Sequence, residues 1–557
     1  MEMMTLEQFT FTYPGQETPA LRDINLLIRP AELTVVCGPS GCGKTTLVRS
    51  MKREIAPYGQ TSGRIFFRDH ELLEGPPQSR AGDIGFVMQD PDHQIVTDTV
   101  WHELAFGLEN MGLPVNMIRR RVAEIAHFFG INSWFERSVL ALSGGQKQIL
   151  NLAAVTAMQP RMIILDEPVA QLDPIATREF LDVLRRIHHE LGTTIVITEH
   201  VLEDIFSMAD QIVCMDSGRI SFAGPPQAFV EQAMTALSPV GVEALPTAVQ
   251  IVQTLAPTHV GPVPLTVGEG RVWLQDYLNQ RMTDRNQTDH ISMQDTAEQA
   301  VAPRSADSGP AILLRARDLW YRYQPDDAFA LRGFSLDIKA GRVLAIVGGN
   351  GSGKSTALHA LAGLLRPQRG QVRQTRDRQL KIALLPQDPR ALFVSDTLRQ
   401  DLALFAEPSG RSQQEVLDLA ATLGLESLLD HHPLDLSGGE QQKAALGMLL
   451  LTQPDIFLLD EPTKGLDIRT RNDLAEILTA QSAQGVAVVI VTHDLEFAAA
   501  HAHTCAMIFN GEVTCVEPTR SFFSGNTFYT TAASRISRGL LDSAITREDV
   551  ISQCQIV

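Results

Sequence analysis

The chain reads Gly38-Pro39-Ser40-Gly41-Cys42-Gly43-Lys44-Thr45 directly after the apolar run 33–37, and this stretch decides the fold. The run is short and rich in β-branched residues, which is typical of a buried strand. Glycines allow consecutive backbone N–H groups to turn toward phosphate oxygens, and a following helix adds a favourable dipole. The stretch therefore predicts a strand, a phosphate-binding loop and a helix, with Lys44 able to reach the phosphates of a nucleotide.

A second loop of this kind, at residues 348–355, indicates that the domain is duplicated. In each half the loop is followed, in the same order, by a glutamine, a Leu-Ser-Gly-Gly sequence, an apolar run ending in Asp-Glu-Pro, and a histidine after another apolar run. Fixed order with small drift in spacing is the signature of an internal repeat. Apolar runs buried on both faces predict parallel strands, so we expect two α/β domains with parallel-sheet cores. Helical spacing at about residues 90–141 predicts a helical subdomain inserted in the first.

The length of 557 residues also favours two domains, because single cores stop growing near about 300 residues. We expect the first domain at residues 1–235 with a C-terminal extension at 236–280, and the second at 311–525 with an extension at 526–557. Residues 281–310 contain no Phe, Trp or Tyr and are rich in Asp, Gln, Thr and Ser, which predicts a flexible polar linker. Such a linker would allow the two domains to dock on one another.

Composition excludes several functional classes. The formal net charge of −18 disfavours bulk binding to nucleic acid, whose phosphates attract Lys and Arg. No apolar run is long enough to span a bilayer, and the N-terminus lacks the features of a secretory signal. The six cysteines form no C-x-x-C pair, so we expect free thiols in a reducing compartment rather than a zinc site.

Carboxylates at the ends of two apolar runs supply groups for hydrolysis. Asp166 and Asp460 end these runs, where a carboxylate can hold Mg²⁺ together with the hydroxyl that follows each loop lysine. Glu167 and Glu461 come next and face the other way, so we expect them to be the general bases. The alternative is a solvated strand end, which two copies at matching distances disfavour.

The two Leu-Ser-Gly-Gly sequences, Leu142 to Gln146 and Leu436 to Glu440, resemble the signature of the ABC ATPase superfamily. This resemblance implies tandem P-loop domains that each add a small antiparallel β region, bind ATP and Mg²⁺, and pair head to tail. The ATP of Lys44 would then be completed by Ser437 and Gly439, and that of Lys354 by Ser143 and Gly145. Serine hydroxyls and glycine N–H groups at a helix start are suitable anion donors. Hydrolysis would require both domains.

The resemblance also assigns roles by matching motif. It implies that Gln89 and Gln387 sense the γ-phosphate and Mg²⁺ and that His200 and His493 orient the γ-phosphate and water. Tyr13 and Tyr323 precede their loop lysines by equal spacing and are expected to stack on adenine, although a lone tyrosine there is more often a core residue. The expected catalytic residues are Glu167, Glu461, His200, His493, Gln89 and Gln387. The expected metal ligands are Thr45, Gln89, Asp166, Ser355, Gln387 and Asp460. The expected ATP-binding residues are Tyr13, Gly38, Ser40, Gly41, Gly43, Lys44, Thr45, Thr46, Ser143, Gly145, Tyr323, Gly348, Asn350, Gly351, Gly353, Lys354, Ser355, Thr356, Ser437 and Gly439.

Residues 89–110 and 524–531 resemble the energy-coupling-factor branch of these ATPases, which drives uptake of vitamins or transition-metal ions in prokaryotes. The resemblance implies two partners as separate chains, a transmembrane coupling subunit and a small substrate-binding membrane subunit. It places the chain at the cytoplasmic face of the cell membrane as a peripheral protein. We hypothesise that Asp90 and Asp92 pair with basic residues of the coupling subunit; the alternative is a solvated acidic turn.

A translation factor that acts on ribosomes is the alternative, because such factors also join two cassettes in one chain. They use a basic helical linker to reach RNA, whereas residues 281–310 carry more acidic than basic side chains. The sequence does not identify the transported substrate, the order in which the two sites fire, or the effect of Glu440 in the second signature.

Overall fold

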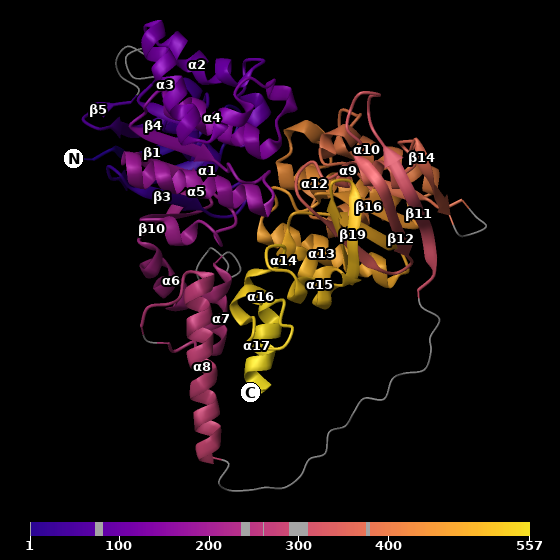
Figure 1. Ribbon diagram of the computed structural model, residues 1–557. Helices are drawn as coiled ribbons and strands as arrows, with labels where there is room; N and C mark the ends of the chain where they lie inside the picture. Colours follow the sequence, from indigo (N-terminus) through magenta and orange to yellow (C-terminus); the bar gives the residue numbers. More distant parts are fainter. Residues whose placement is uncertain are drawn as a thin grey trace. The chain divides into compact units, whose positions relative to one another are not determined.

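The computed structural model describes residues 2–72, 82–235, 245–259, 261–288, 310–374 and 379–556. These residues form two compact units, Met1–Thr266 and Val267–Val557. Figure 1 labels their helices and strands. Each unit carries one glycine-rich loop.

The first unit is built on a six-stranded sheet in the order β10-β9-β3-β8-β7-β6, in which all strands except β10 run parallel. A smaller antiparallel sheet has the order β2-β1-β4-β5. The strands of the large sheet are β3 (Leu33–Cys37), β6 (Ile84–Val87), β7 (Met162–Asp166), β8 (Thr194–Thr198), β9 (Gln211–Asp216) and β10 (Arg219–Gly224), and those of the small sheet are β1 (Met4–Thr12), β2 (Leu21–Ile28), β4 (Gln60–Phe67) and β5 (His70–Glu71).

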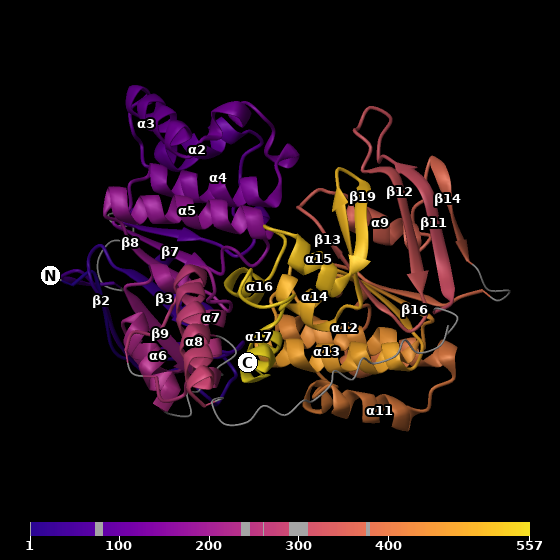
Figure 2. The same cartoon turned by 60° about the horizontal axis from the view of Figure 1, so that its bottom comes forward.

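Helices cover the large sheet of the first unit. Figure 2 shows α4 and α5 between strands β7 and β8 and the helical subdomain formed by α2 and α3, and α2 and α3 both contact α4. The helices are α1 (Lys44–Ser50), α2 (Val100–Asn110), α3 (Val115–Phe128), α4 (Gly144–Ala157), α5 (Pro174–Leu191), α6 (Pro226–Thr235) and α7 (Thr247–Leu255), and a short 3-10 turn, η3 (Pro91–His93), precedes α2.

The second unit repeats this architecture with sheets β15-β16-β17-β13-β18-β19 and β12-β11-β14. Its strands are β11 (Ile312–Tyr321), β12 (Leu331–Lys339), β13 (Val343–Val347), β14 (Arg369–Gln374), β15 (Ile382–Leu385), β16 (Ile456–Asp460), β17 (Ala487–Val491), β18 (Thr504–Phe509) and β19 (Glu512–Pro518). Its helices are α8 (Val267–Thr288), α9 (Lys354–Leu361), α10 (Leu398–Ala406), α11 (Gln413–Thr422), α12 (Gly438–Leu451), α13 (Ile468–Ala483), α14 (Leu495–His501), α15 (Thr519–Gly525), α16 (Ala532–Ser537) and α17 (Arg547–Ile556), with a 3-10 turn η8 (Pro389–Leu392). The predicted tandem α/β fold, with parallel cores, small antiparallel regions and helical subdomains, is confirmed.

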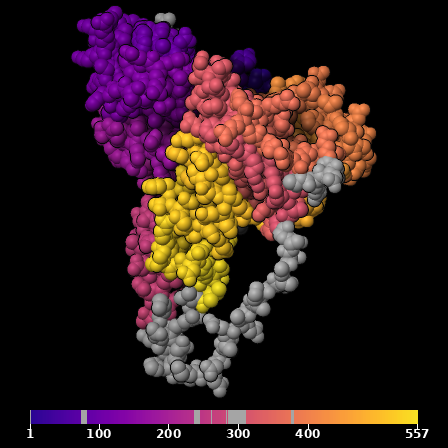
Figure 3. Space-filling model, turned by 45° about the vertical axis from the view of Figure 1, so that its right-hand side comes forward, coloured from indigo at the N-terminus to yellow at the C-terminus, as the bar shows by residue number. Residues whose placement is uncertain are grey.

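The domain to which helix α8 belongs differs from our expectation, which placed residues up to 280 in an extension of the first domain. Helix α8 precedes the second nucleotide loop by a long stretch of chain, yet it belongs to the second unit because it packs on α16. Arg271 donates a hydrogen bond to the backbone oxygen of Arg538, and Arg281 donates one to the backbone oxygen of Cys554 at 2.6 Å. Figure 3 shows α8 beside the C-terminal helices. The helix also continues through residues 281–288, where we expected the linker to begin, and the remainder of the expected linker, residues 289–309, lies outside the described residues.

Two further expectations can be compared with the fold. All six cysteines are free thiols, as expected. Within the described ranges, none of the helices combines the length and the apolarity needed to cross a bilayer.

Candidate active site

The first glycine-rich loop has the conformation that a phosphate cradle requires. Gly41 has φ +77°, and a side chain built there would meet no heavy atom within 4 Å, so its inner face is open. Gly43 has φ +104°, and a Cβ there would lie 2.9 Å from the backbone oxygen of Ala20, which only glycine tolerates. The loop ends at Lys44, the first residue of α1, which places the helix N-terminus against the loop.

Lys44 lies inside its own loop. Its Nζ donates to the backbone oxygens of Gly38 at 2.9 Å and Pro39 at 3.1 Å, and the side chain is buried. The Thr45 hydroxyl donates to Asp166 Oδ1 at 3.1 Å, as does the Thr198 hydroxyl at 2.9 Å. A cation, a hydroxyl and a carboxylate therefore meet at the end of β7.

Glu167 is held in a strained and well-connected position. Its φ of +46° is unusual for a non-glycine residue and costs roughly 1 kcal/mol or more, which is typical of functional sites. His200 Nε2 lies 2.7 Å from Glu167 Oε1, and Gln89 Nε2 donates to Glu167 Oε2 at 3.0 Å. Lys44 Nζ lies 3.4 Å from His200 Nδ1, so the side chains of Lys44, His200 and Glu167 form a continuous set of contacts.

The two carboxyl groups of this site have pKa values shifted in opposite directions. Burial is the main cause of the raised pKa of Asp166, only partly offset by the hydrogen bond from Thr198. Burial also opposes ionisation of Glu167, but its hydrogen bond with His200 and the charges of His200 and Lys44 together lower its pKa. Glu167 is therefore ionised and can accept a proton, as a general base must.

The second unit assembles the corresponding residues. Lys354 Nζ donates to the backbone oxygens of Gly348 at 2.8 Å and Gly349 at 2.9 Å. His493 Nε2 lies 3.0 Å from Glu461 Oε1, and Glu461 has the same strained backbone, with φ +51°. Ser355 is hydrogen-bonded to Asp460, whose pKa is raised chiefly by burial.

Unsatisfied buried atoms in the second site fit a bound metal and nucleotide. Oδ1 of Asp460, Nδ1 of His493 and Oγ of Ser352 are buried without a hydrogen-bond partner. Buried polar atoms normally have partners, so such a group beside an open phosphate loop is suited to a ligand. A carboxylate oxygen is a ligand that Mg²⁺ prefers, and Asp460 with Ser355 supplies the expected donor set.

Gln387 is placed differently from Gln89. Both follow the strand at the edge of their parallel sheet, β15 and β6. Gln89 contacts Glu167, whereas among the hydrogen bonds of the described residues Gln387 makes none with Glu461. Among the described residues, the glutamine is therefore hydrogen-bonded to the expected catalytic carboxylate in the first site only.

The signature residues lie at the N-termini of α4 and α12, where their backbone N–H groups point out of the helix. Ser143 caps α4 in a capping box with Gln146, and Ser437 does the same for α12 with Glu440. Glu440 Oε2 accepts from the Ser437 backbone at 2.8 Å and from its hydroxyl at 2.7 Å. Glutamate thus performs the capping role of glutamine at this position. The expected action of Ser143, Gly145, Ser437 and Gly439 on the ATP of the opposite domain stays a prediction.

Tyr13 and Tyr323 occupy equivalent places beside the loop helices. The Tyr13 hydroxyl lies 3.0 Å from Thr46 Oγ1, and the Tyr323 hydroxyl lies 3.1 Å from Thr356 Oγ1. Tyr13 is partly buried and Tyr323 is 60% exposed. Each ring is thus attached to the helix that follows the phosphate loop, with part of its surface accessible to a base.

We expect Tyr13→Ala to weaken ATP binding at the first site about tenfold, because stacking on a base is worth roughly 1–3 kcal/mol. Tyr13→Phe keeps the ring and loses only the bond to Thr46, so its affinity should stay within about twofold. Titration with a fluorescent ATP analogue, in a chain whose second site is disabled by Lys354→Ala, measures both. Equal losses in the two variants would contradict stacking and assign the effect to the hydroxyl that contacts Thr46.

Glu199 lies beside the site and was not identified from the sequence. Glu199 is fully buried next to the catalytic residues, and burial followed by repulsion from Glu167 raises its pKa well above the usual range. The repeat does not single out Glu199, because the equivalent position of the second domain is Thr492 and not a carboxylate. Glu199 contacts the backbone N–H of Val169 and takes no part in the set around Lys44.

The acidic residues after Gln89 have partners inside the chain. Asp90 accepts a hydrogen bond from the backbone of Asp92 at 3.0 Å and lies 3.4 Å from His93 Nδ1. Asp92 forms an ion pair with Lys147 at 2.5 Å. These contacts within the chain therefore do not support the hypothesis that Asp90 and Asp92 pair with basic residues of a partner.

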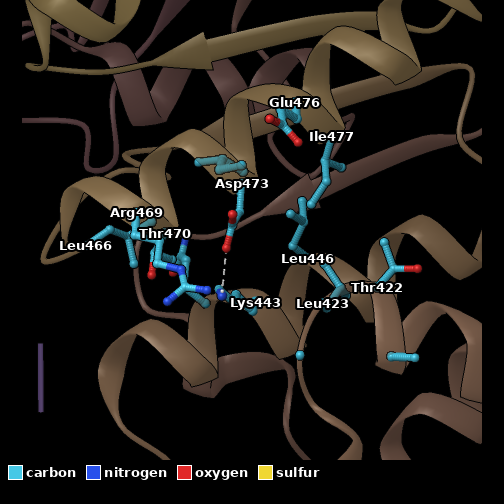
Figure 4. A pocket seen from close by; sticks show the side chains of 14 residues that line it. Thr422, Leu423, Lys443, Leu446, Leu466, Arg469, Thr470, Asp473, Glu476 and Ile477 are labelled. Atoms are coloured by element: carbon cyan, nitrogen blue, oxygen red, sulfur yellow. Dashed lines mark hydrogen bonds and ion pairs between the residues drawn. The ribbon is translucent and has the colours of Figure 1, made fainter.

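A separate cavity of about 370 Å³ lies between α11, α12 and α13 of the second unit, away from the nucleotide loop. Figure 4 shows Lys443 and Asp473 paired across it, with Leu423, Leu446 and Ile477 on its apolar side. In the first unit Arg186 lies 4.2 Å above the Phe128 ring at the matching place, where the second has Ala480 and Thr422.

Comparison with known proteins identifies the family of both units. The sequence model of the ABC transporter family matches residues 21–170 and 331–464. A candidate ABC transporter ATP-binding protein of Bacillus anthracis is 38% identical over 99% of this chain and 98% of its own length. YkoD of Bacillus subtilis (strain 168), named as a candidate HMP/thiamine import ATP-binding protein, is 28% identical over 92% of this chain and 91% of its own.

Two solved structures are similar to this chain. CbiO1 from Clostridium perfringens, described as part of the ABC transporter complex CbiONQ, is 32% identical, covers 42% of this chain and 92% of its own, and has a TM-score of 0.38. The archaeal ribosome recycling factor aABCE1, solved with the ribosomal stalk protein aP1, is 20% identical, covers 93% of this chain and 91% of its own, and has a TM-score of 0.57. At that identity the second likeness shows a shared fold alone.

Proposed function

Because this chain belongs to the ABC transporter family of ATP-hydrolysing proteins, we propose that it powers a membrane importer of the energy-coupling-factor type, which takes up a vitamin or a transition-metal ion. The observation that carries the ATPase part is the pair of complete catalytic sets, each with a strained glutamate bonded to a histidine beside a phosphate loop. The import part is supported by residues 89–110 and by the name of the thiamine-import relative.

The residues of each site have separable roles in hydrolysis. Lys44 and Lys354 exchange loop carbonyls for the β- and γ-phosphate oxygens of ATP, and the loop amides hold the same oxygens. Glu167 and Glu461 accept a proton from the attacking water, and His200 and His493 keep each carboxylate oriented. Thr45 with Asp166, Ser355 with Asp460, and the glutamine of each site would hold Mg²⁺, which would neutralise negative charge on the phosphates. Tyr13 and Tyr323 hold the adenine.

We also propose that the two domains pair head to tail. In this arrangement Ser143 and Gly145 bind the ATP of Lys354, and Ser437 and Gly439 bind the ATP of Lys44. The transmembrane coupling subunit and the small substrate-binding subunit are separate chains, and this chain binds them at the cytoplasmic face of a prokaryotic membrane. Exposed Val96 and Val394, at equivalent places after Gln89 and Gln387, are suited to contact helices of the coupling subunit.

Affinity capture of the tagged chain from detergent-solubilised native membranes tests this function. We expect small polytopic membrane proteins to co-purify, and Val96→Asp with Val394→Asp to reduce their recovery while ATP binding persists. Leu364→Asp, at a similarly exposed apolar side chain, is the matched control and should not reduce recovery. Capture of ribosomal proteins without membrane partners would overturn the importer and favour a translation factor.

A further inference from the structure

Side chains of helix α4 in the first unit bond to the segment that carries Gln89. Lys147 Nζ pairs with Asp92 Oδ1 at 2.5 Å, Gln148 Nε2 donates to the backbone oxygen of Met88 at 3.2 Å, and Asn151 Nδ2 donates to that of Pro91 at 3.2 Å. Gln148 and Asn151 are each 1% exposed. We call these three contacts, from one turn of α4 to residues 88–92, the α4 clamp.

The clamp fixes the backbone on both sides of Gln89. Met88 is held on one side and Pro91 on the other, while the side chain of Gln94 returns to the same strand end, accepting from Met88 N at 2.8 Å and donating to Phe86 O at 3.0 Å. Gln89 Nε2 then donates to Glu167 Oε2 at 3.0 Å. An immobilised backbone limits the positions of the amide, so the clamp determines whether Gln89 reaches the catalytic carboxylate.

The second unit has no equivalent of these contacts among its described residues. Gln441 and Ala445 occupy the positions of Lys147 and Asn151, and Gln442 that of Gln148. Gln441 Nε2 donates to the backbone oxygen of Pro433, and Gln442 Nε2 to that of Pro462. Asp388 is paired with Arg390 within its own turn. In the described part of the second unit, Gln441 and Gln442 thus donate to Pro433 and Pro462 rather than to the backbone beside Gln387.

We propose that Lys147, Gln148 and Asn151 are positioning residues that hold Gln89 on Glu167 and make the first catalytic site the more preorganised of the two. Ser143 begins the same helix, so movement of Gln89 toward a γ-phosphate moves a signature serine with it. This last step rests on the proposed head-to-tail pairing, in which Ser143 serves the ATP of Lys354. The nucleotide state of the Lys44 site is thereby coupled to the Lys354 site through α4.

Charge reversal across the ion pair tests the clamp in the purified full chain. With Glu461→Gln present, so that the remaining turnover reports the Lys44 site, we expect Lys147→Asp or Asp92→Lys alone to lower kcat about fivefold or more while KM changes less than about twofold. The double reversal should restore kcat to within about twofold, because it rebuilds the ion pair in the opposite sense. Lys443→Asp, which breaks the ion pair with Asp473 on the signature helix of the second unit, is the matched control and should leave kcat unchanged.

A second variant keeps the test independent of the charge reversal. Lys147→Gln with Asn151→Ala gives α4 the residues of α12, and it should slow the Lys44 site by a similar factor when the thermal midpoint shows a folded chain. Single reversals without effect on kcat, or a double reversal that fails to restore it, would overturn the clamp. Because no membrane protein is present, the clamp can stand even if the importer fails, and the capture experiment can succeed even if the clamp fails.

Discussion

Replacing both Glu167 and Glu461 by glutamine should abolish ATP turnover while ATP binding persists. Glutamine has the shape of glutamate and can still contact His200 or His493, but it cannot accept a proton from water. General-base catalysis contributes about 10²–10⁴-fold, so turnover in the double variant should fall by at least about a hundredfold. Phosphate release measures turnover, and binding of a fluorescent ATP analogue measures affinity.

The chain supplies a matched control for this loss. Glu199 adjoins Glu167, but burial raises its pKa well above the usual range and disfavours its charged form. Glutamine resembles the neutral acid, so Glu199→Gln should retain most of the activity. Each single variant, Glu167→Gln or Glu461→Gln, shows how far one site can turn over alone. Turnover in the double variant at more than about a tenth of the unmodified rate would assign the proton acceptor to another group.

Replacing Lys44 by alanine should remove one of two ATP sites. Its ammonium lies within the loop on the oxygens of Gly38 and Pro39, where phosphate oxygens can take their place. Hydrogen bonds to charged groups are worth about 1.5–3 kcal/mol each, so loss of two weakens ATP binding by roughly a hundredfold or more. Lys354→Ala should do the same at the second site, and the double variant should bind no ATP at micromolar concentrations.

Calorimetric titration measures the number of ATP molecules bound per chain, which should fall from two to one in either single variant. Lys44→Arg keeps the charge but cannot fit the same loop contacts, and should give an intermediate affinity. The thermal midpoint without nucleotide controls for folding. Two sites of unchanged affinity in Lys44→Ala would contradict the assignment of this lysine to phosphate binding.

The positions of the candidate catalytic residues could be predicted because each stands next to a motif at a constrained place in the fold. Asp166 and Asp460 end parallel strands, and the glycines of residues 38–43 and 348–353 permit the positive φ angles that a phosphate loop requires. The sheet brings the ends of β3, β7 and β8 to one edge, so Lys44, Glu167 and His200 meet there although they are far apart in sequence.

Contacts that depend on side-chain orientation could not be predicted in this way. The sequence shows Asp92 as an acidic residue in a turn, and only the folded chain places Lys147 beside it. Gln148 and Gln442 are aligned residues of one type, yet one donates to Met88 and the other to Pro462. The choice depends on which buried carbonyl lies within reach, and that is decided by packing of the neighbouring helices.

The sequence by itself determined the duplication and the fold class and gave the candidate ATP-binding residues, because these follow from residue types at fixed spacing. The tertiary structure alone decided that the two sites differ, because Gln89 donates a hydrogen bond to Glu167 whereas Gln387 makes none with Glu461 in the part of the chain that the structure describes. It also decided that α8 packs with the C-terminal helices of the second unit. Hydrogen bonds and buried contacts between distant residues act over a few ångströms, so they exist only once the chain has folded.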